Sequence, residues 1–224
     1  MSIQTEHHDR PLRADAERNR TKILEAAAQV FAEKGLDATL DEVATAAGVG
    51  VGTVYRRFPD KDSLIGALFD NAVDEIASLA SEAPSRGNSW EALVWFLEQA
   101  LQRQCANRGL RDVVVSSTYP LDRIEEAKCR ITPAIGLLVG RAQDDGYLRR
   151  DVVGADFPIM EMMISFLGNM TAVVAPDLWR RYLTIFLDGL MVSRSEPSAL
   201  FEVPVDSVMR EALRSAHRHA RRPL

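Results

Sequence analysis

The sequence predicts an all-α protein, with a small N-terminal three-helix domain followed by a larger helical domain. Apolar residues recur every three or four positions through most of the 224-residue chain, which is the spacing of helices that bury one face. Residues 39–58 contain the start and stop signals of two short helices separated by a glycine-containing turn. Hydrophobic residues make up 46% of the chain, which is enough for a packed core.

The first of these short helices is predicted by its end signals. Thr39 is a typical N-cap and Glu42 follows three residues later, so the two side chains are expected to form a capping box. Gly48 allows the positive φ angle that ends a helix and turns the chain. The apolar residues between these signals share one helical face, and they are Leu40, Val43, Ala44 and Ala47.

The second short helix is predicted over residues 51–58, because Pro59 prevents it from continuing. Two short helices joined by a tight turn of this kind indicate a helix-turn-helix. In that motif the second helix enters the major groove of DNA, with its N-terminal end near the bases. The alternative is an ordinary helical hairpin whose arginines are solvated.

The residues on and around the second helix suit contact with DNA. Two glycines let the backbone approach phosphate closely, while hydroxyl groups and positive charges supply donors for bases and phosphates. Val54 has two predicted roles, because it is also expected to anchor the helix in the core together with Phe58. Base reading is predicted for Thr53, Val54, Tyr55 and Arg56, phosphate contact for Thr39, Tyr55, Arg57 and Lys61, and close backbone approach for Gly50 and Gly52.

This part of the chain resembles the DNA-binding domain of TetR-type transcriptional regulators. The run Gly48-Val49-x-x-Gly52-Thr53-Val54-Tyr55-x-x-Phe58-x-x-Lys61-x-x-Leu64 is similar to the signature of that family, and Ile23-Leu24-x-Ala26-Ala27-x-x-x-Phe31-x-x-x-Gly35 is similar to its first helix. The similarity covers about residues 18–70. The family usually carries serine where this chain has Gly50, so a hydroxyl cap and its phosphate contact are lost here.

The resemblance implies a ligand-responsive regulator, in the usual case a repressor that a small effector releases from a palindromic double-stranded operator. It also implies a homodimer and an effector-driven shift of the helix that follows the helix-turn-helix. The competing interpretation is a helical small-molecule-binding protein that does not read DNA.

Composition limits the function further. The net charge of −5 argues against a non-specific DNA coat, although a sequence reader needs positive charge on one small face only. The sequence has no apolar run long enough for a bilayer and no signal-peptide core in its first residues, so we expect no membrane partner and a cytoplasmic location. Cys105 and Cys129 fit a reducing compartment, as buried thiols or as a redox switch.

The remaining elements follow from periodicity and from helix breakers. Residues 1–14 are predicted to be a flexible arm, either solvated or reaching a minor groove. The DNA-binding domain is predicted over 15–83, with a first helix over 15–34 and a linking helix over 60–83 that Asp60 caps. The ligand-binding and dimerisation domain is predicted over 84–224, with helices over 89–106, 110–116, 121–144, 157–174, 177–192 and 205–219.

The last two long helices of this second domain are predicted to form a dimer interface, because they carry more apolar residues than one core can absorb. Aromatic residues are favoured at interfaces. The predicted interface residues are Trp179, Tyr182 and Phe186, with burial in the core of one chain as the alternative for each.

A pocket for a small, mostly apolar effector is predicted between the helices of residues 89–174. Methionines and aromatic side chains provide adaptable apolar walls there, and a few polar groups are available to orient a ligand. Filling of the core is again the alternative. The predicted lining residues are Trp95, Phe96, Gln99, Tyr119, Arg123, Met163, Phe166 and Met170.

No catalytic constellation is recognisable, so we expect neither an enzyme nor a cofactor. The four histidines are all close to the two ends of the chain, and the sequence lacks a phosphate-binding GxxxxGK[ST] loop and a GxSxG elbow. Asp122, Glu125 and Glu126 have the helical spacing of a divalent-ion site, but a solvated helix surface explains them better, so no metal is predicted.

Overall fold

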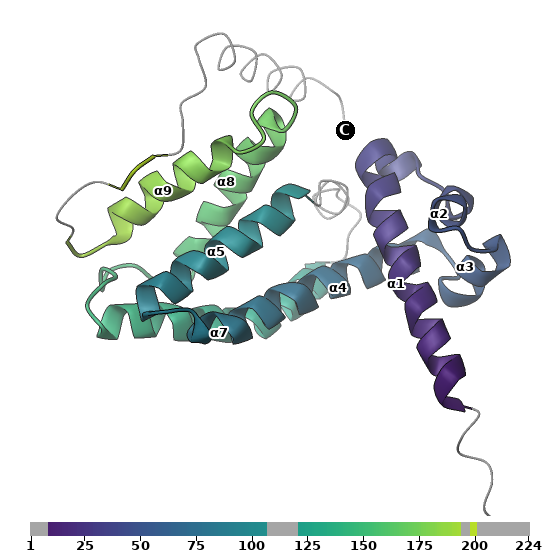
Figure 1. Ribbon diagram of the computed structural model, residues 1–224, viewed down its shortest axis with the longest axis horizontal. Coiled ribbons are helices and arrows are strands. Elements are labelled where there is room, and N and C mark those ends of the chain that lie inside the picture. Colours follow the sequence, from purple (N-terminus) through teal and green to yellow (C-terminus); the bar gives the residue numbers. More distant parts are fainter. Residues whose placement is uncertain (1–8, 107–120, 194–197, 201–224) are drawn as a thin grey trace, which may run out of the picture. The chain divides into compact units, whose positions relative to one another are not determined.

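The computed structural model describes residues 9–106, 121–193 and 198–200, and the regular elements of these residues are helices, as predicted (Figure 1). Two short 3-10 turns, η1 (Gly35–Asp37) and η2 (Ala83–Ser85), follow α1 and α4. The α-helices are α1 (Asp9–Lys34), α2 (Leu40–Ala47), α3 (Val51–Arg57), α4 (Lys61–Glu82), α5 (Ser89–Ala106), α7 (Leu121–Asp144), α8 (Asp156–Thr171) and α9 (Leu178–Leu190).

Most helix ends agree with the sequence-based expectation. Helices α5 and α7 have the predicted bounds at both ends, and Pro133 lies inside α7 without interrupting it. The predicted N-terminal arm is too long, because α1 begins at Asp9 and includes residues 9–14. Pro11 stands in the first turn, where its missing N–H is tolerated. The predicted helices over 110–116 and 205–219 lie outside the described residues.

The chain divides into two compact units, and the division falls inside α4, between Ala72 and Val73. The sequence instead predicts the boundary at the end of this helix, after residue 83. Helix α4 has two apolar stretches, and the first packs into the core of the N-terminal unit through Leu64 and Leu68. The second packs into the core of the C-terminal unit through Leu79 and Ala80. One continuous helix therefore belongs to both hydrophobic cores.

The N-terminal unit is built around α1, which packs against α2, while α2 packs against α3. One face of α1 is buried, since Ile23, Ala27 and Phe31 have almost no exposed surface. The core is completed by Val43 of α2, Val54 of α3, Phe58 and the first apolar residues of α4.

The predicted capping box at the start of α2 is present. The Thr39 side chain accepts a hydrogen bond from the backbone N–H of Glu42 at 3.3 Å, and the Glu42 carboxylate accepts one from the backbone N–H of Thr39 at 2.9 Å. Gly48 ends α2 with a φ angle of 65°, in the left-handed region that favours glycine. These two ends fix the length of α2 and hence the start of α3.

Replacing Thr39 by alanine is expected to lower the free energy of unfolding by about 1 kcal/mol, because the substitution removes the acceptor for an N–H group of the first turn. Urea denaturation of the wild type and the variant measures this difference. Thr45→Ala is a matched control on the same helix, because the Thr45 hydroxyl donates to the carbonyl of Asp41 and caps no terminus. An equal loss in both variants would contradict the capping role.

The C-terminal unit is centred on α5, which packs against α7, α8 and α9. The N-terminus of α5 carries a second reciprocal cap. Asn88 Oδ1 accepts from the Glu91 N–H at 2.9 Å, and Glu91 Oε2 accepts from the Asn88 N–H at 3.2 Å. Gly87 has a φ angle of 64°, and a side chain there would collide with the Glu91 carboxylate. The sequence-based expectation placed this helix correctly but overlooked its cap.

The helices around α5 approach one another closely at Gly168 of α8. A Cβ atom added at this position would lie 2.6 Å from the Cys105 sulfur of α5 and 3.4 Å from the Cβ atom of Trp179 on α9. The missing side chain therefore allows three helices to meet at one point. None of the described helices is both long enough and apolar enough to span a bilayer.

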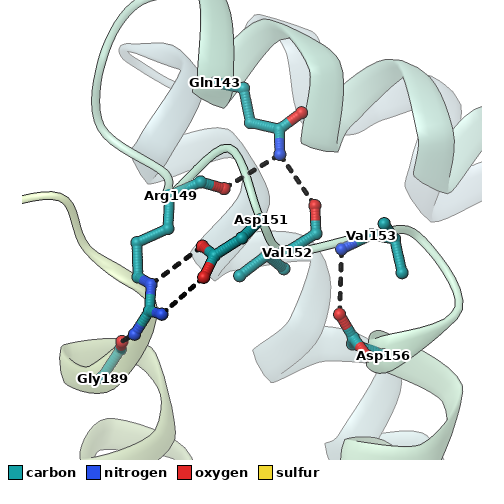
Figure 2. A network of polar contacts seen from close by, with 7 residues as sticks. All are labelled: Gln143, Arg149, Asp151, Val152, Val153, Asp156 and Gly189. Carbon is teal, nitrogen blue, oxygen red and sulfur yellow. Dashed lines mark hydrogen bonds and ion pairs between the residues drawn. The ribbon is translucent and has the colours of Figure 1, made fainter.

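A polar network holds the connection between α7 and α8 (Figure 2). The Gln143 amide donates to the carbonyl oxygens of Arg149 at 2.9 Å and Val152 at 2.8 Å. The Arg149 guanidinium donates two bonds to the Asp151 carboxylate, at 3.0 and 2.6 Å, and a third to the Gly189 carbonyl at 3.4 Å (Figure 2). The connection between α7 and α8 is thus tied to the last turn of α9.

Candidate nucleic-acid interface and apolar surfaces

The exposed face of α3 carries most of the predicted DNA-contacting side chains. Tyr55 has 46% of its surface exposed, Arg56 and Arg57 are exposed, and Thr53 is half-buried. Val54 has no exposed surface and belongs to the core. Of the two roles predicted for Val54, anchoring the helix agrees with the structure and reading a base does not.

The two predicted glycines lie at the N-terminal end of this helix. Gly50 occupies the N-cap position with no side-chain cap, and Gly52 lies in the first turn. A Cβ atom at Gly52 would meet nothing within 4 Å. Glycine inside a helix lowers stability by roughly 1 kcal/mol relative to alanine. Because the packing does not require glycine at position 52, its presence suggests a role outside the domain.

Tyr55 is oriented by α2. Its hydroxyl donates a hydrogen bond to the carboxylate of Asp41, whose negative charge is the main reason that the pKa of Tyr55 is raised above its ordinary value. The phenol ring thus remains on the surface in a defined position, with its hydroxyl protonated. The hydroxyl of a surface tyrosine can bond to water, so it does not need a carboxylate partner such as Asp41.

The acidic residues beside α3 are partly neutralised. Glu42 contacts Lys34 of α1 at 2.5 Å and also accepts the capping bond, and together these interactions lower its pKa to about 2. Neither Arg56 nor Arg57 pairs with a carboxylate in the described part of the chain, and Lys61 is the first residue of α4. Asp60 caps α4 as predicted, because its carboxylate accepts from the Ser63 N–H at 2.7 Å.

The described residues of the predicted effector pocket lie in different environments. Phe96 is fully buried in the core of the C-terminal unit. Trp95 is half-buried with the Arg86 guanidinium 4.5 Å from its ring centroid, and the Gln99 side chain accepts from Arg103 at 3.3 Å. Arg123 is exposed and lies 3.6 Å from Glu126. Tyr119 lies outside the described residues.

The other predicted pocket residues belong to α8, and they lie on its outer side. Met163 and Phe166 have 47% and 56% of their surface exposed, and Met170 is half-buried. Ile159 and Met162 extend the same exposed stripe at helical spacing. Helices α5 and α9 pack only against the opposite side of α8, where Met160, Ile164 and Gly168 lie.

Helix α9 divides in the same way. Trp179 is buried in the core of its own chain, which agrees with the alternative stated for it and not with the predicted place in a dimer interface. Tyr182 is half-buried, and Phe186 is exposed next to Ile185. Between α8 and α9 is a small, mainly apolar cavity of about 220 Å³, lined by Asp156, Phe157, Ile159, Met160, Met163, Phe186 and Leu190.

The sequence-based reasoning missed a buried polar stripe on α8, formed by Glu161, Ser165 and Asn169. These residues lie at i, i+4 and i+8 and are buried, with 9%, 4% and 2% of their surface exposed. Three polar residues at this spacing in an otherwise apolar helix are a readable signal. Glu161 Oε1 and Asn169 Oδ1 have no hydrogen-bond partner in the structure, and leaving each unsatisfied destabilises the fold by roughly 1–3 kcal/mol.

The fold and the surface of α3 together define a helix-turn-helix DNA-binding regulator with a helical second domain. Residues 23–68 match the family model of bacterial regulatory proteins of the tetR family, and residues 88–192 match the C-terminal domain of SbtR-like transcriptional regulators. The chain belongs to the TetR family of transcriptional regulators.

Related proteins agree with this membership. The chain is 35% identical over 192 residues to the HTH-type transcriptional repressor KstR2 of Rhodococcus jostii, covering 76% of this chain and 90% of the relative. A TetR regulatory protein from Mycobacterium vanbaalenii has a similar crystal structure, with a TM-score of 0.65, 33% identity and coverage of 81% of this chain and 100% of the other. The match to the uncharacterized HTH-type regulator Mb2274c of Mycobacterium bovis is 42% identical over 74 residues, 33% of this chain, and spans 38% of that relative's length.

Proposed function

We propose that the protein is a cytoplasmic repressor that binds a palindromic operator as a homodimer and is released by a small, mostly apolar effector. The observation that carries the DNA-binding part is the surface of α3, where Tyr55, Arg56 and Arg57 are exposed and the arginines have no acidic partner in the described chain. The relative KstR2 is named a repressor, which supports repression rather than activation for this protein. No feature of the described residues suggests catalysis.

The proposed DNA contacts divide by chemistry. Tyr55, Thr53 and Arg56 supply donors and acceptors for base edges, while Thr39, Arg57 and Lys61 supply donors for phosphate oxygens. Gly50 and Gly52 add no side chains between the backbone and the DNA. The test is selection of bound duplexes from a random library, followed by anisotropy titration of the selected site. Recovery of no enriched sequence would contradict operator recognition.

The proposed dimer forms through the outer faces of α8 and α9. A stripe of four apolar side chains on α8, with Ile185 and Phe186 on α9, is larger than the scattered apolar residues of a typical monomer surface. A second copy of the chain would cover this stripe by the same patch, as expected for a two-fold symmetric pair. The stripe on α8 consists of Ile159, Met162, Met163 and Phe166.

Replacing Phe166 by glutamate is expected to convert the dimer into a monomer of 24.9 kDa, because the new charge would be buried in an apolar interface. Light scattering at micromolar concentration measures the mass. Leu137→Glu on α7 is the matched control, since Leu137 is also exposed, at 70%, but lies outside the stripe. A monomeric wild type, or a dimeric Phe166→Glu protein, would contradict the proposed interface.

The effector is proposed to act through α4. This helix belongs to both hydrophobic cores, so a ligand that shifts its second part also changes the position of its first part. The ligand must bind the non-DNA-binding state more tightly, and a tenfold loss of DNA affinity requires about 1.4 kcal/mol of coupling. A ligand that stabilises the protein and leaves DNA affinity unchanged would contradict this coupling.

A further inference from the structure

An exposed valine begins the helix that is proposed to read DNA. Val51 is the first residue of α3, and 42% of its surface is exposed. Val49, two residues earlier, is half-buried and packs against the N-terminal core, whereas Val51 belongs neither to that core nor to the described side chains packed against it. The packing of the described residues therefore does not explain why position 51 is apolar.

Helix stability does not explain this residue either. Valine is a poorer helix former than alanine, because its branched side chain loses conformational freedom against the backbone. The first turn of a helix favours acidic side chains, and α3, which the structure describes throughout, has none there. A polar or acidic residue at this exposed helix start would stabilise the isolated domain better than Val51 does.

The two neighbours of Val51 leave its side chain alone at the start of α3. Gly50 precedes it as the N-cap and Gly52 follows it, so neither neighbour adds a side chain. A Cβ atom at Gly52 would meet nothing within 4 Å, and one at Gly50 would lie 3.8 Å from Thr53 Oγ1, so packing requires glycine at neither position. A valine side chain is short and reaches a base only where the backbone comes close to the DNA. The two glycines permit that approach.

Val51 also lies beside the tyrosine that is proposed to contact bases. Residues four apart are neighbours on a helix surface, and Tyr55 is 46% exposed. The Tyr55 hydroxyl donates to the Asp41 carboxylate, which holds the phenol ring in a defined position. The two side chains thus form one exposed face, which is apolar at Val51 and polar at the Tyr55 hydroxyl.

We propose that Val51 is a specificity-determining residue that contacts the C5-methyl group of a thymine in the operator. The inference rests on the proposed function and names a chemical feature that α3 reads. In the major groove the base edges present hydrogen-bond donors and acceptors, and thymine adds a methyl group. Val51 placed against a polar edge would displace water and replace none of its hydrogen bonds. Contact with the methyl group avoids that penalty and removes apolar surface from water.

Selection from a random duplex library locates the thymine. The wild type should enrich thymine at one position of each half-site. The same selection with Val51→Ala should lose this preference and retain the other enriched positions. The variant is expected to fold, because the substitution shortens an exposed side chain and alanine is the better helix former.

Replacing that thymine by deoxyuridine isolates the methyl group, because uracil pairs as thymine does and lacks only the C5-methyl. Fluorescence anisotropy with the full chain measures both affinities. Uracil in one half-site should weaken wild-type binding about fourfold, as expected for the loss of one buried methyl group. Val51→Ala should bind the thymine and uracil duplexes with equal affinity.

Val192→Ala is the matched control. Val192 is also exposed, at 57%, but it follows α9 in the C-terminal unit. This variant should discriminate between the thymine and uracil duplexes by the same factor as the wild type. Loss of discrimination in both variants would show that the effect does not depend on position 51.

The proposal is overturned if no position enriches thymine, or if the wild type binds the thymine and uracil duplexes equally at every thymine of the operator. It is also overturned if Val51→Ala retains the discrimination, since another side chain would then contact the methyl group. These results leave operator recognition intact, because a selected site is still bound. Recovery of no enriched sequence would instead contradict the proposed function and, with it, a base contact by Val51.

Discussion

Raising the pH from about 4.5 to 7 is expected to lower the free energy of unfolding, with Glu161 contributing about 3 kcal/mol to the loss. Burial raises the pKa of this carboxyl from its ordinary value of 4.5 to about 7 in the folded protein. Between these values the folded state holds a proton that the unfolded state has released, so stability falls as the pH rises. Above about 7 both states are ionised and the contribution becomes constant.

Denaturant unfolding of the wild type and Glu161→Gln at a series of pH values measures this contribution. The variant should lack most of the decline, because its amide does not titrate. Glu42, Asp60 and Asp151 have lowered pKa values, so their contributions have the opposite sign and are lost below about pH 4.5, outside the window for Glu161. The same decline in wild type and variant would show that the Glu161 carboxyl is not the titrating group.

The local features of this fold were predictable because their signals are local. The capping box at Thr39, the turn at Gly48 and the cap at Asp60 depend on residues within a few positions of one another, and all three are present. The bounds of α5 and α7 were predictable for the same reason. The start of α1 was not, since its first residues carry no apolar periodicity and proline near a helix start is ambiguous.

The assignment of helix faces to neighbours was the part that sequence reasoning missed. Helical spacing states which side chains lie on one face, but not whether that face is covered by the same chain or by a second one. Trp179 and Phe186 of α9 are both aromatic, yet Trp179 is in the core and Phe186 is exposed. For α8, the sequence predicts Met163 and Phe166 as pocket-lining residues, and in the described chain 47% and 56% of their surface is exposed.

Glu161 shows a second reason why part of the structure could not be predicted from the sequence. Sequence reasoning treats a single acidic residue in a helix as solvated, because charged residues are rarely buried without a partner. Only the packing of α5 against α8 reveals that this carboxyl is enclosed next to Gln104. Functional groups that depend on a contact between distant segments are thus invisible to patterns within one segment.

The largest effect on DNA binding is expected from Tyr55→Ala, which should weaken binding to the selected operator by roughly ten- to a hundredfold. In the proposed complex the exposed phenol presents its hydroxyl oxygen and an aromatic surface to the major groove, and the hydrogen bond to Asp41 holds the hydroxyl before DNA binds. Fluorescence anisotropy with the operator and with a scrambled duplex, at fixed salt, separates specific from non-specific affinity.

Two comparisons make this result specific to α3. Tyr147→Ala removes another exposed tyrosine, from the α7–α8 connection, and should leave both DNA affinities unchanged. Lys61→Ala should weaken operator and scrambled duplex alike and reduce the salt dependence by about one ion, as loss of a phosphate contact does. If Tyr55→Ala protein bound the operator as tightly as the wild type, α3 would not be the reading helix, because its most exposed aromatic side chain would make no contact with the bases.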